Sequence, residues 1–160
     1  MSAVRHNLVL RAGDVRDLGA VNGLSAAAFD PRFGEAWTPS QCAGMLALPG
    51  VWLTIASEND RILGFAMSRS VLDDGELLLL AVDPVGRRHG VGRALLRSVI
   101  AEAEMRGSSY IHLEVRAGNP AVALYRGEGF SKIGERRKYY RGNNGEQFDA
   151  HTYRRTLSQE

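Results

Sequence analysis

The chain has 160 residues, 44% of them hydrophobic and 24% charged, which is typical of one soluble globular domain with a sizeable core. The formal net charge of +2 is too small to indicate nucleic-acid binding, and no stretch is apolar over a length that would span a membrane. Cys42 is the only cysteine, which excludes an internal disulfide and fits a reducing compartment. We therefore expect a single cytoplasmic domain over residues 1–160, with no metal, nucleic-acid or membrane partner.

The first predicted elements are a short strand, two helices and a strand meander. Leu8–Arg11 predicts the strand, and apolar residues at helical spacing predict a helix over Val15–Phe29. Thr38 and Gln41 have the spacing of a capping box, so a second, short helix should begin there. Three strands joined by tight polar turns then predict an antiparallel meander. These strands are Val51–Ala56, Ile62–Val71 and Leu77–Val82.

The connector between the first two helices is rich in aromatic residues. It contains Phe29, Phe33 and Trp37, which is an unusual number of large rings for a loop. The rings either anchor the connector on the core or form the wall of a substrate channel. The sequence leaves both explanations open.

A buried strand, a glycine-rich turn and an amphipathic helix follow one another in the middle of the chain. Leu77–Val82 is apolar without alternation, as in a strand covered on both faces, and Val91–Arg106 has helical spacing. Between them, Gly90 and Gly92 allow another group to approach the backbone. The arginines of this turn disfavour the helix by about 0.3–1 kcal/mol each unless an anion is bound. The turn therefore has the properties of a phosphate cradle.

Three alternatives for this turn can be weighed from the residues. A Walker loop is excluded, because no Gly-Lys-Ser/Thr follows a glycine at the required spacing. A dinucleotide fingerprint is weak, since Leu95 stands where a third glycine or alanine is needed, although Glu114 is an acidic residue at the expected distance. The remaining alternative is a tight turn with solvated arginines and no ligand.

The second half of the chain predicts a second strand beside the first. Tyr110–Val115 alternates like a strand, and a helix joins it to Leu77–Val82, so these two strands should be parallel neighbours. A short helix is expected over Ala121–Arg126, followed by strands at Lys132–Glu135 and Phe148–Leu157. Together the elements predict an α/β layered fold with a mixed sheet.

Several of these motifs resemble those of the GNAT N-acetyltransferases. The run Arg87-x-x-Gly90-x-Gly92 matches the acyl-CoA pyrophosphate loop of that superfamily. The runs EVRAGN and RRKYY, with Trp37-Thr38, are more specifically similar to the bacterial ribosomal-protein-alanine (RimI-type) N-acetyltransferases, from about residue 8 to residue 157. The resemblance implies the GNAT fold. That fold is a mixed, mostly antiparallel sheet of about six to seven strands with about four helices, whose central parallel pair is splayed to admit acetyl-CoA.

The resemblance also implies roles for individual residues. Glu114 would be the general base and Tyr125 the general acid, while the N–H of Val82 would stabilise the oxyanion. The backbone of Leu80–Val82 would pair with the pantetheine arm, and N–H groups of the glycine-rich turn would bind pyrophosphate. The expected cofactor-binding residues are Leu80, Ala81, Val82, Arg87, Arg88, His89, Gly90, Val91, Gly92, Arg93 and Asn119. The expected substrate-binding residues are Phe33, Trp37, Tyr139 and Tyr140, with selection in the loops Phe29–Trp37 and Arg136–Gly145.

One departure from the family pattern affects the acid. The segment from Asn119 to Tyr125 is one residue shorter than usual, and one residue turns a helix face by about 100°. We expect the turn before the helix to absorb the change, which keeps Tyr125 in place and makes Asn119 the less secure assignment. Otherwise Tyr139 or Tyr140 replaces Tyr125 as the general acid. These two tyrosines face opposite ways in a regular strand.

The implied activity is acetyl transfer from acetyl-CoA to the N-terminal α-amino group of a protein, such as ribosomal protein S18. A small-amine acetyltransferase acting on a polyamine or aminoglycoside is the first alternative. A small polycation would need a carboxylate-lined pocket, whereas the two loops offer mainly rings and arginines, which favours a peptide. A non-catalytic acyl-CoA-binding module is the second alternative.

Overall fold

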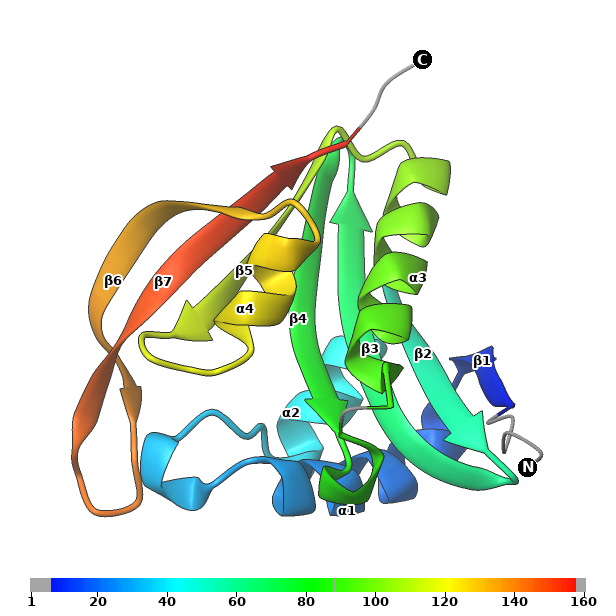
Figure 1. Ribbon diagram of the computed structural model, residues 1–160, viewed down its shortest axis with the longest axis horizontal. Coiled ribbons are helices and arrows are strands. Elements are labelled where there is room, and N and C mark those ends of the chain that lie inside the picture. The colour runs from blue at the N-terminus through cyan, green and yellow to red at the C-terminus, as the bar shows by residue number, and fades with distance from the viewer. Residues whose placement is uncertain (1–6, 88, 158–160) are drawn as a thin grey trace, which may run out of the picture.

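A seven-stranded sheet forms the centre of the computed structural model, which describes residues 7–87 and 89–157 (Figure 1). The strand order is β1-β2-β3-β4-β5-β7-β6, and β4 and β5 are parallel whereas the other neighbouring pairs are antiparallel. The strands are β1 (Leu8–Gly13), β2 (Val51–Glu58), β3 (Arg61–Val71), β4 (Asp74–Val82), β5 (Tyr110–Arg116), β6 (Ser131–Arg141) and β7 (Gln147–Thr156). The predicted mixed α/β fold is confirmed.

Helices cover both faces of the sheet (Figure 1). They are α1 (Leu18–Ala28), α2 (Pro39–Leu46), α3 (Val91–Met105) and α4 (Val122–Gly127). Helices α1 and α2 pack on one face, and α3 and α4 pack on the other. None of the described helices is long and apolar enough to cross a membrane.

The helix starts follow the predicted caps. The side chain of Thr38 accepts from the N–H of Gln41 at 3.1 Å, and the Gln41 side chain accepts from the N–H of Thr38 at 2.7 Å. This confirms the capping box of α2. The first helix begins instead with a 3-10 turn, Val15–Asp17, before the α-helical turns of α1.

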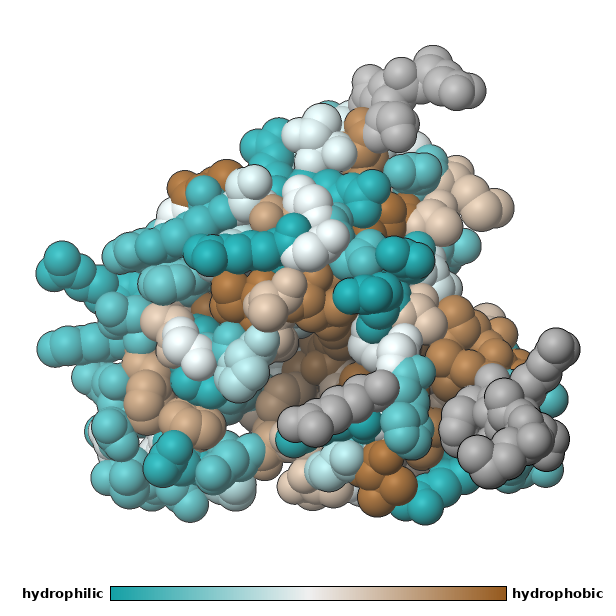
Figure 2. Space-filling view, viewed as in Figure 1, coloured by the Kyte–Doolittle hydropathy of each residue, from teal (hydrophilic) through white to brown (hydrophobic). Residues whose placement is uncertain are grey.

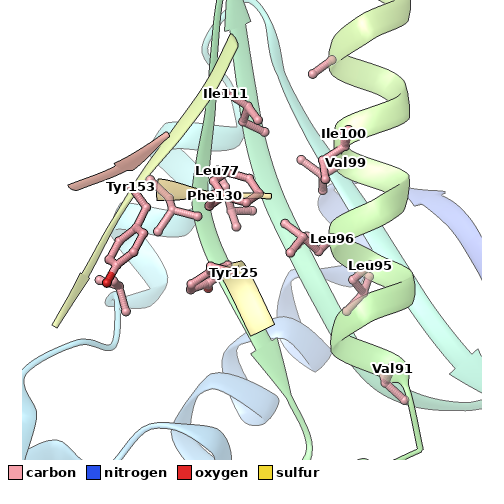
Figure 3. Packing of buried hydrophobic residues seen from close by; sticks show 14 of the residues in the cluster. Leu77, Val91, Leu95, Leu96, Val99, Ile100, Ile111, Tyr125, Phe130 and Tyr153 are labelled. Carbon is pink, nitrogen blue, oxygen red and sulfur yellow. The ribbon is translucent and has the colours of Figure 1, made fainter. Parts of the chain in front are cut away.

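The core between α3 and the sheet orients the strand that forms the site. Figure 3 shows Leu95, Leu96 and Val99 of α3 projecting toward the sheet, with Leu77 and Ile111 of the parallel pair opposite. Each of these side chains is at most 5% exposed, and burying one contributes about 1.5–3 kcal/mol. This packing fixes the glycine-rich turn next to the end of β4.

A β-bulge in β4 opens the sheet. Met67 pairs with Leu79 while Ser68 pairs with Leu77, so Leu78 is an extra residue opposite β3. A bulge bends its strand and increases the local twist. The parallel pairing with β5 stops at the same point, at Leu77 and Leu113, and the two strands part beyond it. The predicted splay therefore has an identifiable cause, which the sequence pattern did not show.

Strand β6 is longer than predicted and is irregular. It extends past Glu135 to Arg141, with three residues on β6 between the pairs Arg136–Ala150 and Tyr140–Phe148, opposite Asp149 alone. At the centre of this bulge Lys138 has a φ of 52°, and its N–H donates to Asp149 Oδ1 at 2.9 Å. The bulge changes which way the neighbouring side chains point.

Candidate active site

A cavity of about 1100 Å³ lies where β4 and β5 separate. The glycine-rich turn and α4 border it on one side of the sheet, and the connector between α1 and α2 borders it on the other. Figure 2 shows a hollow with apolar residues inside it in the middle of the face that is viewed. The cavity therefore joins the two faces of the sheet through the gap between the strands.

The start of α3 presents backbone N–H groups to one end of this cavity. Gly90 precedes the helix with a φ of 76° and gives no side-chain cap, and Gly90, Val91, Gly92 and Arg93 line the cavity. The first N–H groups of a helix have no acceptor within the helix, so they can bind an anion.

Two arginines of this turn, Arg87 and Arg93, have partners within the protein. Arg87 donates to the carbonyl of Ala28 at 3.0 Å, at the end of α1, and Arg93 lies 3.3 Å from a carboxylate oxygen of Glu128. Their presence therefore does not by itself require a bound anion, contrary to the simplest argument from the sequence. The backbone amides and the dipole of α3 are the stronger indication of an anion site.

The exposed edge of β4 forms the next part of the cavity wall. The N–H of Asp83 donates to the carbonyl of Leu63 at 2.7 Å, toward β3. Because N–H groups alternate in direction along a strand, those of Leu80 and Val82 point away from β3 and toward the cavity. Within the described residues β5 does not pair with this part of β4. An extended ligand can therefore add to this edge as a strand would.

Glu114 occupies the cavity wall on β5. Its Oε1 lies 2.6 Å from Nε of Arg136, whereas its Oε2 is buried and has no hydrogen-bond partner among the described residues. The side chain is 17% exposed. A buried carboxylate oxygen without a donor is costly, so this atom is suited to accept a proton or a donor from a ligand.

Tyr125 faces the cavity from α4, on the opposite side of the sheet from Glu114. Its ring packs edge-on against Phe130 at 6.0 Å between centroids. Burial raises the pKa of the Tyr125 phenol well above its ordinary value, and the charge of Glu35 adds to this effect. The phenol is therefore protonated at neutral pH.

The connector between α1 and α2 is anchored to β5 by a buried ion pair. Glu35 Oε1 lies 3.1 Å from Arg116 Nε, and its Oε2 accepts from Asn119 Nδ2 at 2.6 Å. The guanidinium of Arg116 also stacks 3.6 Å from the ring centroid of Phe33, which packs edge-on against Phe148. The aromatic connector is thus both packed on the protein and part of the cavity wall.

Tyr139 and Tyr140 both line the cavity. The regular strand assumed from the sequence would turn them in opposite directions, but the bulge at Lys138 breaks that alternation. Their rings meet edge to face at 4.9 Å, and the Tyr140 hydroxyl donates to the carbonyl of Glu114 at 3.4 Å. Burial raises the pKa of the phenol of Tyr140. The two rings narrow the cavity on the side of the connector.

Most of the predicted site residues meet in this cavity. Among the residues described, those that line it are Phe33, Trp37, Leu80, Ala81, Val82, Arg87, Gly90, Val91, Gly92, Arg93, Glu114, Asn119, Tyr125, Tyr139 and Tyr140. His89 is not in the lining, and Arg88 lies outside the described residues. Asn119 is held by Glu35 and also caps the N–H of Ala121 at 2.8 Å.

Glu35, Glu76, Arg116 and Arg136 line the same cavity and were not named as site residues from the sequence, although Glu35 and Arg136 lie within the two loops expected to select the substrate. Arg136 belongs to a basic run that is typical of a solvated strand face, and Arg116 belongs to the run EVRAGN. Glu35 and Glu76 have no motif that would distinguish them. Only the pairing of β4 with β5 and the path of the connector bring them here.

The acetyltransferase (GNAT) domain family matches residues 20–142 of the chain. The chain belongs to the GNAT acetyltransferase family. The resemblance deduced from the sequence motifs is therefore confirmed.

Named relatives are similar over different shares of their length. A [ribosomal protein bS18]-alanine N-acetyltransferase of Escherichia coli (strain K12) is 44% identical over 90 residues, which span 56% of this chain and 61% of that relative. An N-alpha-acetyltransferase RimI of Mycobacterium tuberculosis is 36% identical over 126 residues, 76% of each chain. The crystal structure of the ribosomal-protein-S18-alanine N-acetyltransferase from Escherichia coli superposes with a TM-score of 0.84 at 32% identity, covering 96% of both chains.

The cavity of this GNAT domain fits acetyl-CoA. The N–H groups at the start of α3 suit a pyrophosphate, and the N–H groups of Leu80 and Val82 suit the amides of a pantetheine arm. At Gly92 an added Cβ would lie 3.3 Å from Leu124, so the glycine keeps the turn close to α4. Among the described residues no cluster of histidine, cysteine and carboxylate side chains could hold a metal ion.

Proposed function

We propose that this GNAT domain transfers an acetyl group from acetyl-CoA to the N-terminal α-amino group of a protein, such as ribosomal protein S18. The observation that carries the proposal is the carboxylate of Glu114, whose unpartnered Oε2 lies in the wall of the cavity where β4 and β5 part. The two Escherichia coli relatives are named as N-acetyltransferases of the alanine of ribosomal protein S18, and the Mycobacterium tuberculosis relative is named as an N-alpha-acetyltransferase, which supports this acceptor.

Two side chains of the cavity, those of Glu114 and Tyr125, transfer protons in this reaction. Acetyl-CoA supplies an acyl group activated as a thioester. An α-amino group has a pKa of about 7.7–8.0, so it is mostly protonated at neutral pH, and Glu114 accepts its proton directly or through a water. Tyr125, which is protonated at neutral pH, lines the cavity on the side of α4 and donates a proton to the leaving sulfur.

The register of the strands favours Leu80 over Val82 as the oxyanion donor. Glu114 is one residue beyond the last parallel pair, Leu77–Leu113, so it is level with Leu78. At about 3.3 Å per residue, the N–H of Val82 lies about 13 Å further along β4, whereas that of Leu80 lies about 7 Å along. A base and an oxyanion donor act on neighbouring atoms, so Leu80 is the better placed of the two.

The charges of the cavity favour a peptide over a polyamine. Four carboxylates, those of Asp30, Glu35, Glu76 and Glu114, line the cavity, more than the two loops had suggested, and so do four arginines, Arg87, Arg93, Arg116 and Arg136. Glu35 and Glu114 are each paired with an arginine, at 3.1 and 2.6 Å. The cavity therefore has no excess negative charge to attract a small polycation.

Steady-state kinetics with a panel of peptides and with spermidine test this proposal. Glu114→Gln should lower kcat by about 10²- to 10⁴-fold while coenzyme A still binds in calorimetry. Glu135→Gln, an exposed carboxylate outside the cavity, is the matched control and should leave kcat unchanged. Thiol release with spermidine alone would refute the peptide acceptor, and full activity of Glu114→Gln would refute the base. Coenzyme A binding without any acceptor would identify a non-catalytic module.

A further inference from the structure

A carboxylate, an imidazole and a second carboxylate connect the cavity to the outer surface. Glu76 lines the cavity, and its Oε1 lies 3.8 Å from Nε2 of His112. The other ring nitrogen of His112, Nδ1, lies 3.0 Å from Oδ1 of Asp74. The side chains of Glu76, His112 and Asp74 are 37%, 24% and 46% exposed. The three groups therefore lie in a row from the cavity wall to solvent, in contact at 3.8 and 3.0 Å but not joined by formed hydrogen bonds.

The parallel pairing of β4 and β5 creates this series. Asp74 and Glu76 share one face of β4, and His112 and Glu114 share the same face of β5, because side chains alternate along a strand. Glu76 is directly opposite His112, and Glu114 is two residues further along β5. The base of the proposed reaction is thus the next residue on this face, diagonal to Glu76.

The surroundings of Glu76 suit a group that receives and passes on a proton. Burial raises the pKa of the Glu76 carboxyl, and the charges of Asp74 and Glu114 act in the same direction. His112, and Arg69 on the adjacent strand β3, act in the opposite direction. Asp74 Oδ1 lies 3.0 Å from Nδ1 of His112 without the geometry of a formed hydrogen bond. Its negative charge favours the tautomer with the proton on Nδ1, which leaves the Nε2 lone pair facing Glu76.

Acetyl transfer to an ammonium group releases one proton to solvent. The nitrogen forms a bond to the acyl carbon and loses two protons, and the carbon–sulfur bond breaks. One proton goes to the sulfur, so that the products are an amide and a thiol. The other proton, taken up by Glu114, has to leave before the next turnover. Glu114 is only 17% exposed, and bound reactants would cover it further.

We propose that Glu76 and His112 carry this proton from Glu114 to solvent, with the nearby charge of Asp74 stabilising the imidazolium. The inference rests on the proposed function, because it assumes that Glu114 accepts a proton from the amine. Glu114 passes the proton to Glu76 through a water. Glu76 passes it to Nε2 of His112 through a second water, because the 3.8 Å between Oε1 and Nε2 is too long for a direct hydrogen bond. The imidazolium then releases the proton on Nδ1 next to Asp74, and exchange with water restores the starting tautomer.

Chemical rescue and solvent isotope effects test the relay. In a dilute buffer, His112→Ala should lower kcat at least about tenfold with KM unchanged, and the deuterium isotope effect of the solvent on kcat should grow. Added imidazole should restore most of kcat, because a diffusible base replaces the missing ring. Glu76→Gln, which keeps the shape of the side chain, should lower kcat with the same rise in the isotope effect.

His151→Ala is the matched control. This histidine is 23% exposed, also lies 3.8 Å from a glutamate, Glu135, and is not in the cavity lining, so its variant should keep kcat with and without imidazole. An unchanged kcat in His112→Ala would overturn the relay, as would a loss that imidazole does not restore and that leaves the isotope effect unchanged. If His112→Ala fails to fold, Glu76→Gln decides alone. Wild-type enzyme that acetylates no peptide would instead refute the proposed function.

Discussion

The ion pair between Glu35 and Arg116 should contribute cooperatively to stability. The two side chains are 11% and 10% exposed, so removing one partner leaves the other charge buried. Arg116→Met would leave Glu35 with only the amide of Asn119, at 2.6 Å, and breaking a buried pair in this way costs about 3–5 kcal/mol. Glu35→Gln should cost less, about 1.5–3 kcal/mol, because the guanidinium keeps its stack on Phe33 and its contact with the carbonyl of Ala117.

The double variant should be less damaging than the sum of the single variants. Once Glu35 is neutral, Arg116→Met no longer leaves a buried charge without a partner. A coupling free energy of about 1–3 kcal/mol between the two substitutions is therefore expected. Urea unfolding measures this. With an m value of about 2 kcal/mol/M, a loss of about 4 kcal/mol lowers the midpoint by about 2 M. Lys132→Met, which breaks the exposed pair with Glu135, is the control and should cost less than about 1 kcal/mol. Additivity of the two buried changes within about 0.5 kcal/mol would refute the argument.

Three further predictions concern single positions. Tyr125→Phe should lower kcat about 100-fold, whereas Tyr140→Phe should mainly raise KM for the peptide; the opposite pattern in steady-state kinetics would make Tyr140 the acid. Gly34→Ala should destabilise the chain by more than the 1–2 kcal/mol or so of a left-handed residue, because the new Cβ would lie 2.0 Å from the carbonyl oxygen of Arg141; an unchanged melting temperature would contradict this. Cys42 is fully buried, so a thiol reagent should label it only after denaturant is added, and rapid labelling of native protein would show local opening.

The sequence was informative where structure depends on local patterns. The capping box of Thr38 and Gln41 and the helix at Val91 follow from residues a few positions apart, and the parallel neighbour at Tyr110 follows from the order strand, helix, strand. The spacing of apolar residues and the residues that cap helix ends determine such elements, so they can be predicted from a single sequence.

The parts that the sequence did not show depend on residues far apart or on irregular strands. Glu35 meets Arg116 across 81 positions, and no local pattern marks either as a partner of the other. The sequence predicts this strand over Lys132–Glu135 only, and pairing with β7 carries β6 on to Arg141. The position of both tyrosines follows from the bulge at Lys138, which tertiary pairing alone reveals.

The bulge at Leu78 lies inside four consecutive leucines, residues 77–80, so the sequence does not distinguish which of these leucines is the extra residue. If the extra residue migrated by one position, a leucine would replace a leucine at each site, and hydrophobic burial would hardly change. Side-chain identity therefore does not anchor the point at which the sheet divides. The pairs with β3 on either side of Leu78 set its position instead. They are Ser68 with Leu77 and Met67 with Leu79. Shortening the run by one leucine would remove the extra residue opposite β3 and leave the composition almost unchanged, and loss of the cleft in that variant would show that the bulge keeps β4 and β5 apart.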